Sequence, residues 1–332
     1  MYIMEEIERY RHLNKYLNEK FGERTLKICI DGEFTCPNRD GTKGFGGCIF
    51  CSERGSGDHL RPMLQTSPLY ACKKQKYFNM GIDNSIKIIS AQVQNYFKSY
   101  KAERANKFIV YFQNFTNTYD SLENLRLKYS SALIDDRIVG IAIATRPDCI
   151  NEEIVKLIKS YSKKYYVFVE LGLQTSNEQT AKLINRCYTN EDFSKAVKLL
   201  NKYGIDVVTH IMIGLPNEDF KDVKSTVSFI NRHNIQGLKI HSCYIVKNTQ
   251  LEKMYKNQEY EPLSLEYYLD ACTYVLTHIS PNIIIHRISG DAPKNLLIAP
   301  DWNLHKKWII NGIDKVLKEK NLYQGMYYKT KI

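Results

Sequence analysis

Three cysteines stand close together in a glycine-rich stretch near the N-terminus, and their spacing is typical of a metal centre. Eleven residues separate Cys36 from Cys48, and two separate Cys48 from Cys51. The intervening glycines can reach positive φ angles and let backbone N–H groups approach a bulky group closely. The thiols are therefore candidate metal ligands, and their odd number helps to decide which centre they suit.

Three interpretations of this cysteine group are open from the spacing alone. An iron–sulfur cluster with four irons can take three thiolates and leave its fourth iron open to a substrate or cofactor. A structural zinc ion needs four ligands, so His59 or Cys72 would have to supply the last one. The third interpretation is a loop that binds no metal. The odd number of thiols favours the cluster.

The elements that position these cysteines alternate along the chain. The predicted strands are apolar runs at residues 26–31, 107–113, 137–145, 166–173, 206–214 and 237–246. The predicted helices cover residues 84–104, 121–132, 151–163, 177–186, 191–203, 219–233 and 264–279, with Asn151 and Asn190 as expected N-caps. Repeated strand–helix units indicate a parallel sheet with crossover helices, and continuous apolar strands indicate that both faces of the sheet are covered.

Both an α/β barrel, closed or partly open, and an open doubly wound sheet fit this pattern. No GxGxxG follows the first strand, which counts against the dinucleotide-binding form of the open sheet. We expect three parts in the chain of 332 residues: a helical extension over 1–24, the α/β barrel over 25–290, and a loop with a basic helix over 291–332.

Polar residues stand at the ends of the predicted strands, where α/β barrels collect their chemistry. The cysteine group follows the first strand directly. The residues at the ends of later strands are Gln113, Thr145, Arg146, Glu170, Gln174, His210 and His241. We therefore expect the cysteines and these side chains to face the same rim.

The composition is that of a globular chain with a basic surface. Lys and Arg number 47 against 36 Asp and Glu, which gives a net charge of +11. Such a surface attracts polyanions and suits RNA or DNA binding. The sequence contains neither a long apolar run nor the apolar region of a signal peptide. We therefore predict no membrane span, a cytoplasmic location and reduced cysteines.

Motifs over residues 25–310 resemble those of the radical S-adenosylmethionine (SAM) superfamily. The ending CIFC resembles the Cys-x-aromatic-Cys of its cluster motif, and GEFTCPNRDGTKGFGGCIFC (32–51) resembles the YhcC/YtqA-type branch. This branch is related to the catalytic subunit of elongator and to the oxygen-independent coproporphyrinogen oxidases. Further matching segments lie at 111–119, 143–149, 170–186, 209–219, 239–255 and 286–293.

The resemblance implies both a fold and cofactors. The fold would be a partial (β/α)6 TIM-like barrel of the radical SAM type. Cys36, Cys48 and Cys51 would hold one [4Fe-4S] cluster, and SAM would bind its open iron. One electron, from a flavodoxin- or ferredoxin-type donor, would cleave SAM to a 5′-deoxyadenosyl radical that removes a hydrogen atom from the substrate.

The resemblance also implies contacts with SAM. Phe50 would lie near the adenine, Glu170 and Gln174 would bind the ribose, Arg186 the methionine carboxylate, and His210 would be a further polar contact. The chain departs from the superfamily where a GGE-like motif usually holds the SAM amino group. YFQNFTNTY (111–119) stands there, so Gln113 with Thr116 or Asn117 would take this role.

The substrate is less well specified than the cofactors. Elongator-like relatives modify wobble uridines in tRNA, and the basic chain agrees with such a partner. A tRNA nucleoside, with the wobble uridine first, is therefore the leading prediction. A small-molecule or peptide substrate is the alternative, and a zinc-stabilised RNA-binding module without catalysis is a more distant one.

Overall fold

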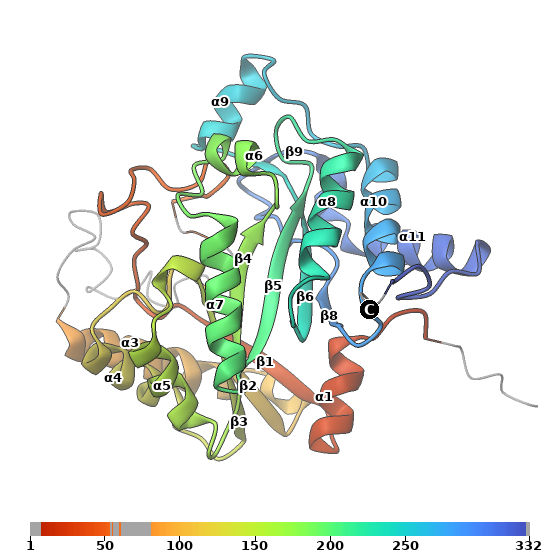
Figure 1. The fold of residues 1–332 in the computed structure, drawn as a ribbon. Helices are drawn as coiled ribbons and strands as arrows, with labels where there is room; N and C mark the ends of the chain where they lie inside the picture. The colour runs from red at the N-terminus through yellow and green to blue at the C-terminus, as the bar shows by residue number, and fades with distance from the viewer. Residues whose placement is uncertain (1–7, 54, 56–59, 61–80, 330–332) are drawn as a thin grey trace, which may run out of the picture.

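Seven parallel strands form one sheet in the computed structural model of the protein, which describes residues 8–53, 55, 60 and 81–329 (Figure 1). In spatial order the strands are β1 (Thr25–Ile30), β2 (Lys107–Phe112), β3 (Ile138–Thr145), β4 (Tyr166–Gln174), β5 (Asp206–Ile213), β6 (Gly237–Ser242) and β8 (Ile284–Arg287). The six predicted strands are confirmed, and β8 adds a seventh. Because β1 and β8 are the two edges of this sheet, the predicted partial barrel is confirmed as well.

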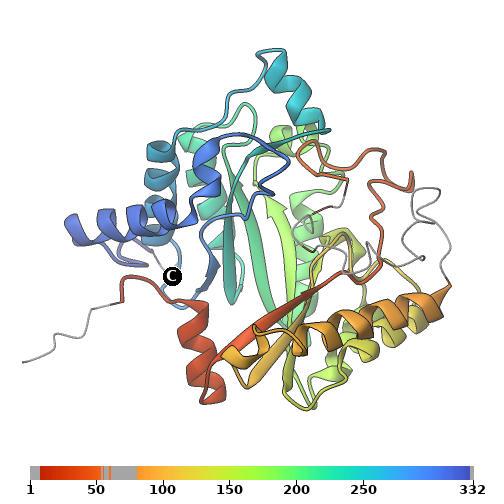
Figure 2. The same ribbon diagram turned by 180° about the vertical axis from the view of Figure 1, so that it is seen from behind.

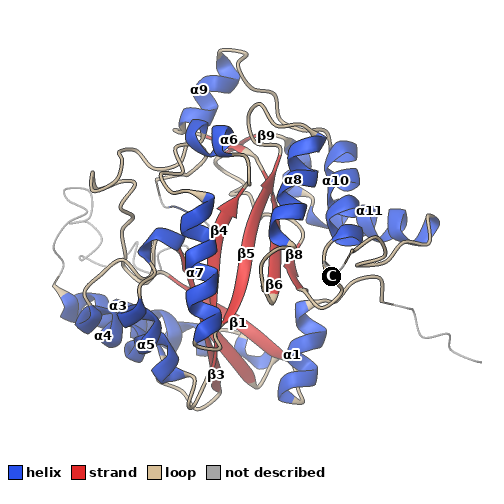
Figure 3. Cartoon of the chain, viewed as in Figure 1, coloured by secondary structure: helices blue, strands red, loops and turns tan. Residues whose placement is uncertain are grey.

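Helices cover the outer face of the sheet, as Figures 1 and 3 show. They are α3 (Ile82–Phe97), α4 (Leu122–Ala132), α5 (Glu152–Tyr161), α7 (Asn190–Lys202), α8 (Phe220–Ile230) and α10 (Leu265–His278). Their apolar sides and the outward side chains of the strands form the main core. The short helix α6 (Glu178–Leu183) lies at the upper end of the sheet (Figure 1), and two 3₁₀ turns, η3 (Ala102–Arg104) and η4 (Pro147–Cys149), complete this part of the chain. Within the described ranges, no helix is long and apolar enough to cross a membrane.

A smaller core fills the inside of the barrel at the amino ends of the strands. Helix α1 (Leu13–Phe21) lies there and buries Leu17 against Ile109, Phe168 and Val208. Figure 2 shows α1 at the lower end of the sheet and the cysteine loop towards the upper end. The strands are thus apolar on both sides at one end, and only their carboxyl ends leave room for a site.

The C-terminal third departs in detail from the predicted elements. The predicted strand 237–246 ends at Ser242, and a separate strand β7 (Ile245–Val246) pairs antiparallel with β9 (Leu297–Ala299). Helix α9 (Gln250–Lys256) was not predicted. The turn η5 (Asp301–Leu304) precedes the expected terminal helix, α11 (Lys306–Glu319).

The helix caps show how local side-chain chemistry sets the helix starts. Asn151 accepts a hydrogen bond from the backbone N–H of Ile154 and caps α5, as predicted. The prediction for Asn190 is wrong, because Thr189 caps α7 in a reciprocal capping box with Asp192. Asn190 is already inside the helix.

Glu218 makes the stability of this fold depend on pH. Burial, opposed by the hydroxyls of Thr175 and Thr180, raises the pKa of Glu218 from 4.5 to about 7. Between these values the unfolded chain releases the proton and the folded chain keeps it, so the free energy of unfolding falls as the pH rises. From pH 5 to pH 8 we expect the wild type to lose about 2–3 kcal/mol of its free energy of unfolding through this group, a loss that E218Q should not show.

Urea unfolding of both proteins at the two pH values measures this difference. E191Q is a matched control, because the Glu191 side chain is 69% exposed on α7. Parallel pH profiles for the wild type and E218Q would contradict the expectation.

Candidate active site

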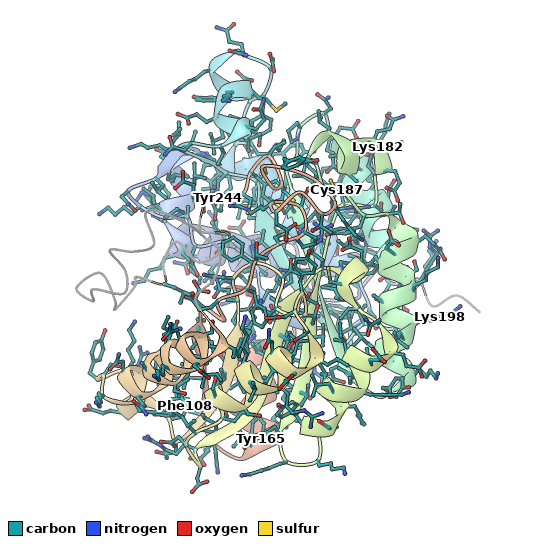
Figure 4. All side chains as sticks on the ribbon, turned by 90° about the vertical axis from the view of Figure 1, so that its left-hand side faces the viewer. Phe108, Tyr165, Lys182, Cys187, Lys198 and Tyr244 are labelled. Carbon is teal, nitrogen blue, oxygen red and sulfur yellow. The ribbon has the colours of Figure 1, made fainter. Side chains whose placement is uncertain are left out.

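A cavity of about 240 Å³ lies at the carboxyl ends of the strands. Its wall includes all three predicted cysteines and side chains from β2, β4, β5, β6 and β8. In Figure 4, Tyr244, which lines the cavity, and Cys187 lie near the cysteine loop at the upper end, whereas Phe108 and Tyr165 mark the lower end. The expectation that strand ends and cysteines share one rim is met.

Tight turns shape the cysteine loop and depend on its glycines. The backbone N–H of Gly47 donates to the Asn38 carbonyl at 2.8 Å, and the φ of Gly47 is +81°. A Cβ on Gly44 would stand 2.3 Å from Oδ1 of Asn38. Since larger residues would strain the first position and collide at the second, the glycines keep the loop close-packed.

The loop is also fastened across the mouth of the barrel. Ile49, between two of the cysteines, donates its N–H to the Ile184 carbonyl at 3.1 Å and accepts from the Leu251 N–H at 2.9 Å. The side chains of Ile49, Ile184 and Leu251 are buried together in an apolar cluster. The segment that carries Cys48 and Cys51 is therefore held between α6 and α9, and apolar packing shields it from water.

The donor set suits a group that uses several separate metal atoms. Cys36, Cys48 and Cys51 line one cavity, yet no three His, Cys, Asp or Glu side chains in the described ranges converge as a single-ion site. Thiolates that each bind a different iron have no need to converge. Burial, with Cys51 nearby, raises the pKa of the Cys48 thiol to about 12, so its ionisation requires a cation beside it. His59 and Cys72, the possible fourth zinc ligands, lie outside the described residues.

An ionic network forms the floor of the cavity. Glu170 is fully buried and accepts hydrogen bonds from Lys27 Nζ at 3.1 Å, from His210 Nε2 at 2.8 Å and from Lys239. Lys239 also donates to the Tyr111 hydroxyl at 3.1 Å. Burial alone would raise the pKa of Glu170, but Lys239 and Lys27 outweigh it and hold this pKa well below its usual range.

This network changes what is expected of Glu170. Its carboxylate already accepts three hydrogen bonds, which leaves it one of about four acceptor positions. Burial lowers the pKa of Lys239 to about 7, so a charge placed above the floor would change the protonation of this lysine. Sequence reasoning missed Lys27 and Lys239, although a lysine inside an apolar strand was the available signal.

The upper wall carries polar groups without partners. The amide of Gln174 makes no hydrogen bond to any described residue, and Oγ1 of Thr116 is buried without one. Phe50 and Gln113 line the same wall. A buried polar atom without a partner is costly, so Oγ1 of Thr116, together with the half-buried amide of Gln174, fits a bound polar ligand such as SAM. Asn117 is outside the cavity, and its amide nitrogen donates to the carbonyls of Phe112 and Ala144.

The structure places Arg186 away from the cavity, which argues against its expected contact with the SAM carboxylate. Its side chain is 0% exposed. All five of its N–H donors are bound within the protein, to the carbonyls of Leu173, Thr175 and Tyr188 and the side chains of Glu178 and Asn190. A guanidinium has only five donors, so none remains for a ligand.

A half-barrel with a three-cysteine loop across its mouth defines the class of protein. Residues 40–230 match the model of the Radical SAM superfamily, and residues 235–319 match that of the Radical_SAM C-terminal domain. The chain belongs to the radical SAM superfamily and is an enzyme of this class. Membership implies a [4Fe-4S] cluster and SAM, which when bound supply one-electron reduction and hydrogen-atom abstraction.

Three known proteins illustrate the range of the similarity. YtqA of Bacillus subtilis is 38% identical over 322 residues, which cover 97% of this chain and 94% of YtqA. The tRNA uridine(34) acetyltransferase of Methanocaldococcus jannaschii is 30% identical over 168 residues, 49% of this chain and 30% of that protein. The solved structure of Methanocaldococcus infernus Elp3 has a TM-score of 0.60 at 21% identity, covering 72% of this chain and 60% of Elp3, and shares the fold.

Proposed function

We propose that this enzyme modifies a nucleoside of tRNA, with the wobble uridine as the first candidate, and that Cys36, Cys48 and Cys51 hold its [4Fe-4S] cluster. One observation carries the cofactor part of the proposal. Three thiols, the unpartnered hydroxyl of Thr116 and the amide of Gln174 line a single cavity at the carboxyl ends of a parallel half-barrel.

Each part of the cavity has a task in this proposal. The cysteines bind three irons, and Phe50, Thr116 and Gln174 orient SAM against the fourth. The floor formed by Glu170, Lys239 and His210 faces the remaining space and offers N–H donors to polar groups of the substrate. The apolar cluster around Ile49 excludes water from the loop.

Two observations support tRNA as the substrate. The net charge of +11 favours a polyanionic partner. The relative named tRNA uridine(34) acetyltransferase is 30% identical over about half of this chain, and its name points to the same class of substrate. The electron donor in this proposal is of the flavodoxin or ferredoxin type.

The test is anaerobic reconstitution with iron, sulfide, SAM and a reductant, in the presence of bulk tRNA from a strain that lacks the gene. We expect 5′-deoxyadenosine and, by mass spectrometry, a nucleoside that is changed relative to the untreated tRNA. A colourless zinc protein that leaves SAM intact would overturn the whole proposal. Formation of 5′-deoxyadenosine with an unchanged nucleoside profile would overturn only the tRNA part.

Gln174 gives a prediction for SAM binding. We expect Q174A to raise the Kd of SAM by about 5–10-fold, the loss of roughly one hydrogen bond, and to leave the cluster content unchanged. Equilibrium dialysis of SAM against the anaerobic protein measures the Kd. Q258A is a matched control, because Gln258 has the same left-handed backbone, φ 62° against 65°, and lies exposed outside the cavity. Equal effects of the two substitutions would contradict this role of Gln174.

A further inference from the structure

An exposed aromatic stack stands at the start of α11. The chain has two tryptophans, and they differ in environment: Trp302 is 6% exposed, whereas Trp308 is 54% exposed. The imidazole of His305 stacks on the Trp308 indole, with ring centroids 3.9 Å apart and planes inclined by 16°. One face of the indole is therefore covered by His305, and most of the remaining side chain meets solvent. We refer to residues 305–308 as the indole platform.

Packing of α11 does not account for the exposure of Trp308. The helix buries Ile309, Ile313 and Leu317, which recur at every fourth position along one side, in the main core. Trp308 stands one residue before this stripe, about 100° around the helix, and so points away from the core. Trp308 and the His305 ring stacked on it therefore present an aromatic surface to solvent that the packing of α11 does not use.

The indole platform is fixed to the rim of the active-site cavity. Asn303, in the preceding turn, accepts a hydrogen bond from Ser242 at the end of β6 at 2.5 Å. Within the platform, Lys306 Nζ lies 3.2 Å from Oδ1 of Asp291, which lines the cavity and also pairs with Arg287 at 2.9 Å. Figures 1 and 2 show α11 leading outward from this point.

The charge of this region favours a polyanion. From residue 301 to the end the chain has seven lysines and three acidic residues, and two of the lysines, Lys306 and Lys307, lie in the platform. Lys307 is exposed and has no ion-pair or hydrogen-bond partner among the described residues. An aromatic face beside cations is an arrangement that binds single-stranded nucleic acid, since a base stacks on the ring and the phosphates meet the lysines.

We propose that the indole platform binds a single-stranded segment of RNA beside the cavity, with one unpaired base stacked on the free face of Trp308 and with Lys307 on the adjacent phosphate. This inference rests on the proposed function insofar as the substrate is RNA, and it adds the surface that presents it. A duplex would not bind in this way, because its bases are already stacked on one another.

The test uses the anaerobic, cluster-loaded enzyme and a fluorescein-labelled 17-nucleotide RNA stem-loop with a seven-base loop, followed by fluorescence anisotropy. We expect W308A to raise the Kd by about 10-fold and W308F, which keeps an aromatic face, by only a few fold. Y100A is the matched control, because the Tyr100 ring is 69% exposed in the segment after α3, and it should change the Kd less than twofold.

Salt dependence tests the phosphate contact separately. K307Q is expected to reduce the slope of log Kd against log salt by about 0.7, the value for one contact to a single strand. K195Q, on the outer helix α7 where the Lys195 side chain is 71% exposed, should leave the slope unchanged. Thermal melts of W308A and K307Q that match the wild type show that the variants are folded.

If the wild type binds and modifies RNA and W308A binds the stem-loop with the same Kd, this inference is overturned and the proposed function stands. Selective loss of dimer formation or of reduction by flavodoxin in W308A, with RNA affinity unchanged, would also overturn it and assign the platform to a protein partner. A wild type that cleaves SAM but neither binds nor modifies RNA would instead remove the proposed substrate class itself.

Discussion

Replacement of Cys48 by alanine is expected to remove the iron–sulfur cluster and to reduce 5′-deoxyadenosine formation to background. Cys48 lines the cavity between Cys36 and Cys51 on a loop whose turns depend on glycine. Loss of a direct ligand should exceed the roughly 10- to 100-fold loss typical of residues that only support a metal ligand. Iron and sulfide content, the absorbance near 400 nm and 5′-deoxyadenosine after addition of a reductant are the measurements.

Cys187 supplies the matched control for this substitution. It is exposed and lies beside the same loop, where its Sγ would be 3.2 Å from a Cβ on Gly44, but it does not line the cavity. We expect C187S to bind iron and to cleave SAM as the wild type does. If C48A kept a full cluster, or if C187S lost it, the assignment of the three ligands would be wrong.

The long buried strands were predictable from the sequence, whereas the short elements of the C-terminal third were not. Strands such as β3 and β4 are buried on both sides, so their sequences are continuously apolar and easy to recognise. The two-residue strand β7 and the seven-residue helix α9 are too short to show a period. Thr249 caps α9 and was the available signal for its start, but a single capping residue also occurs in turns.

The site was predictable where residue type and strand position were sufficient. Gln113, Glu170, Gln174 and His210 all line the cavity. Gln113 follows β2 and Gln174 ends β4, whereas Glu170 and His210 stand in the middle of β4 and β5. Sequence position did not reveal that the Glu170 carboxylate would pair with Lys27 and Lys239 inside the protein. Lys27 in β1 and Lys239 in β6 are far apart along the chain, and their meeting at Glu170 depends on the curvature of the sheet.

The position of Arg186 differs from the expectation because local backbone geometry decides where its side chain points. Its neighbours Asn185 and Cys187 both have left-handed backbones, with φ of 55° and 59°. This double turn directs the guanidinium into the protein, under the end of β4, where the Leu173 and Thr175 carbonyls accept its hydrogen bonds at 2.8 Å. The twelve-residue spacing from Gln174 carries no information about such a turn.

The largest effect on stability is therefore expected at Arg186. Lysine keeps the charge but has three N–H donors in place of five, so R186K leaves at least two of the five acceptors without a partner. A buried acceptor without a partner costs about 1–3 kcal/mol. We expect R186K to lower the free energy of unfolding by about 3 kcal/mol or more, measured by urea unfolding.

The control for R186K is R137K, which distinguishes the contribution of burial to the free energy of unfolding from that of an exposed ion pair. Arg137 forms a two-pronged ion pair with Asp135 at 2.9 Å, but its side chain is 44% exposed, so R137K should change the stability by less than about 1 kcal/mol. At a temperature where R186K is folded, its Kd for SAM should equal that of the wild type, because none of its donors faces the cavity. An R186K protein of normal stability with weakened SAM binding would restore the carboxylate-binding role and place Arg186 in the active site after all.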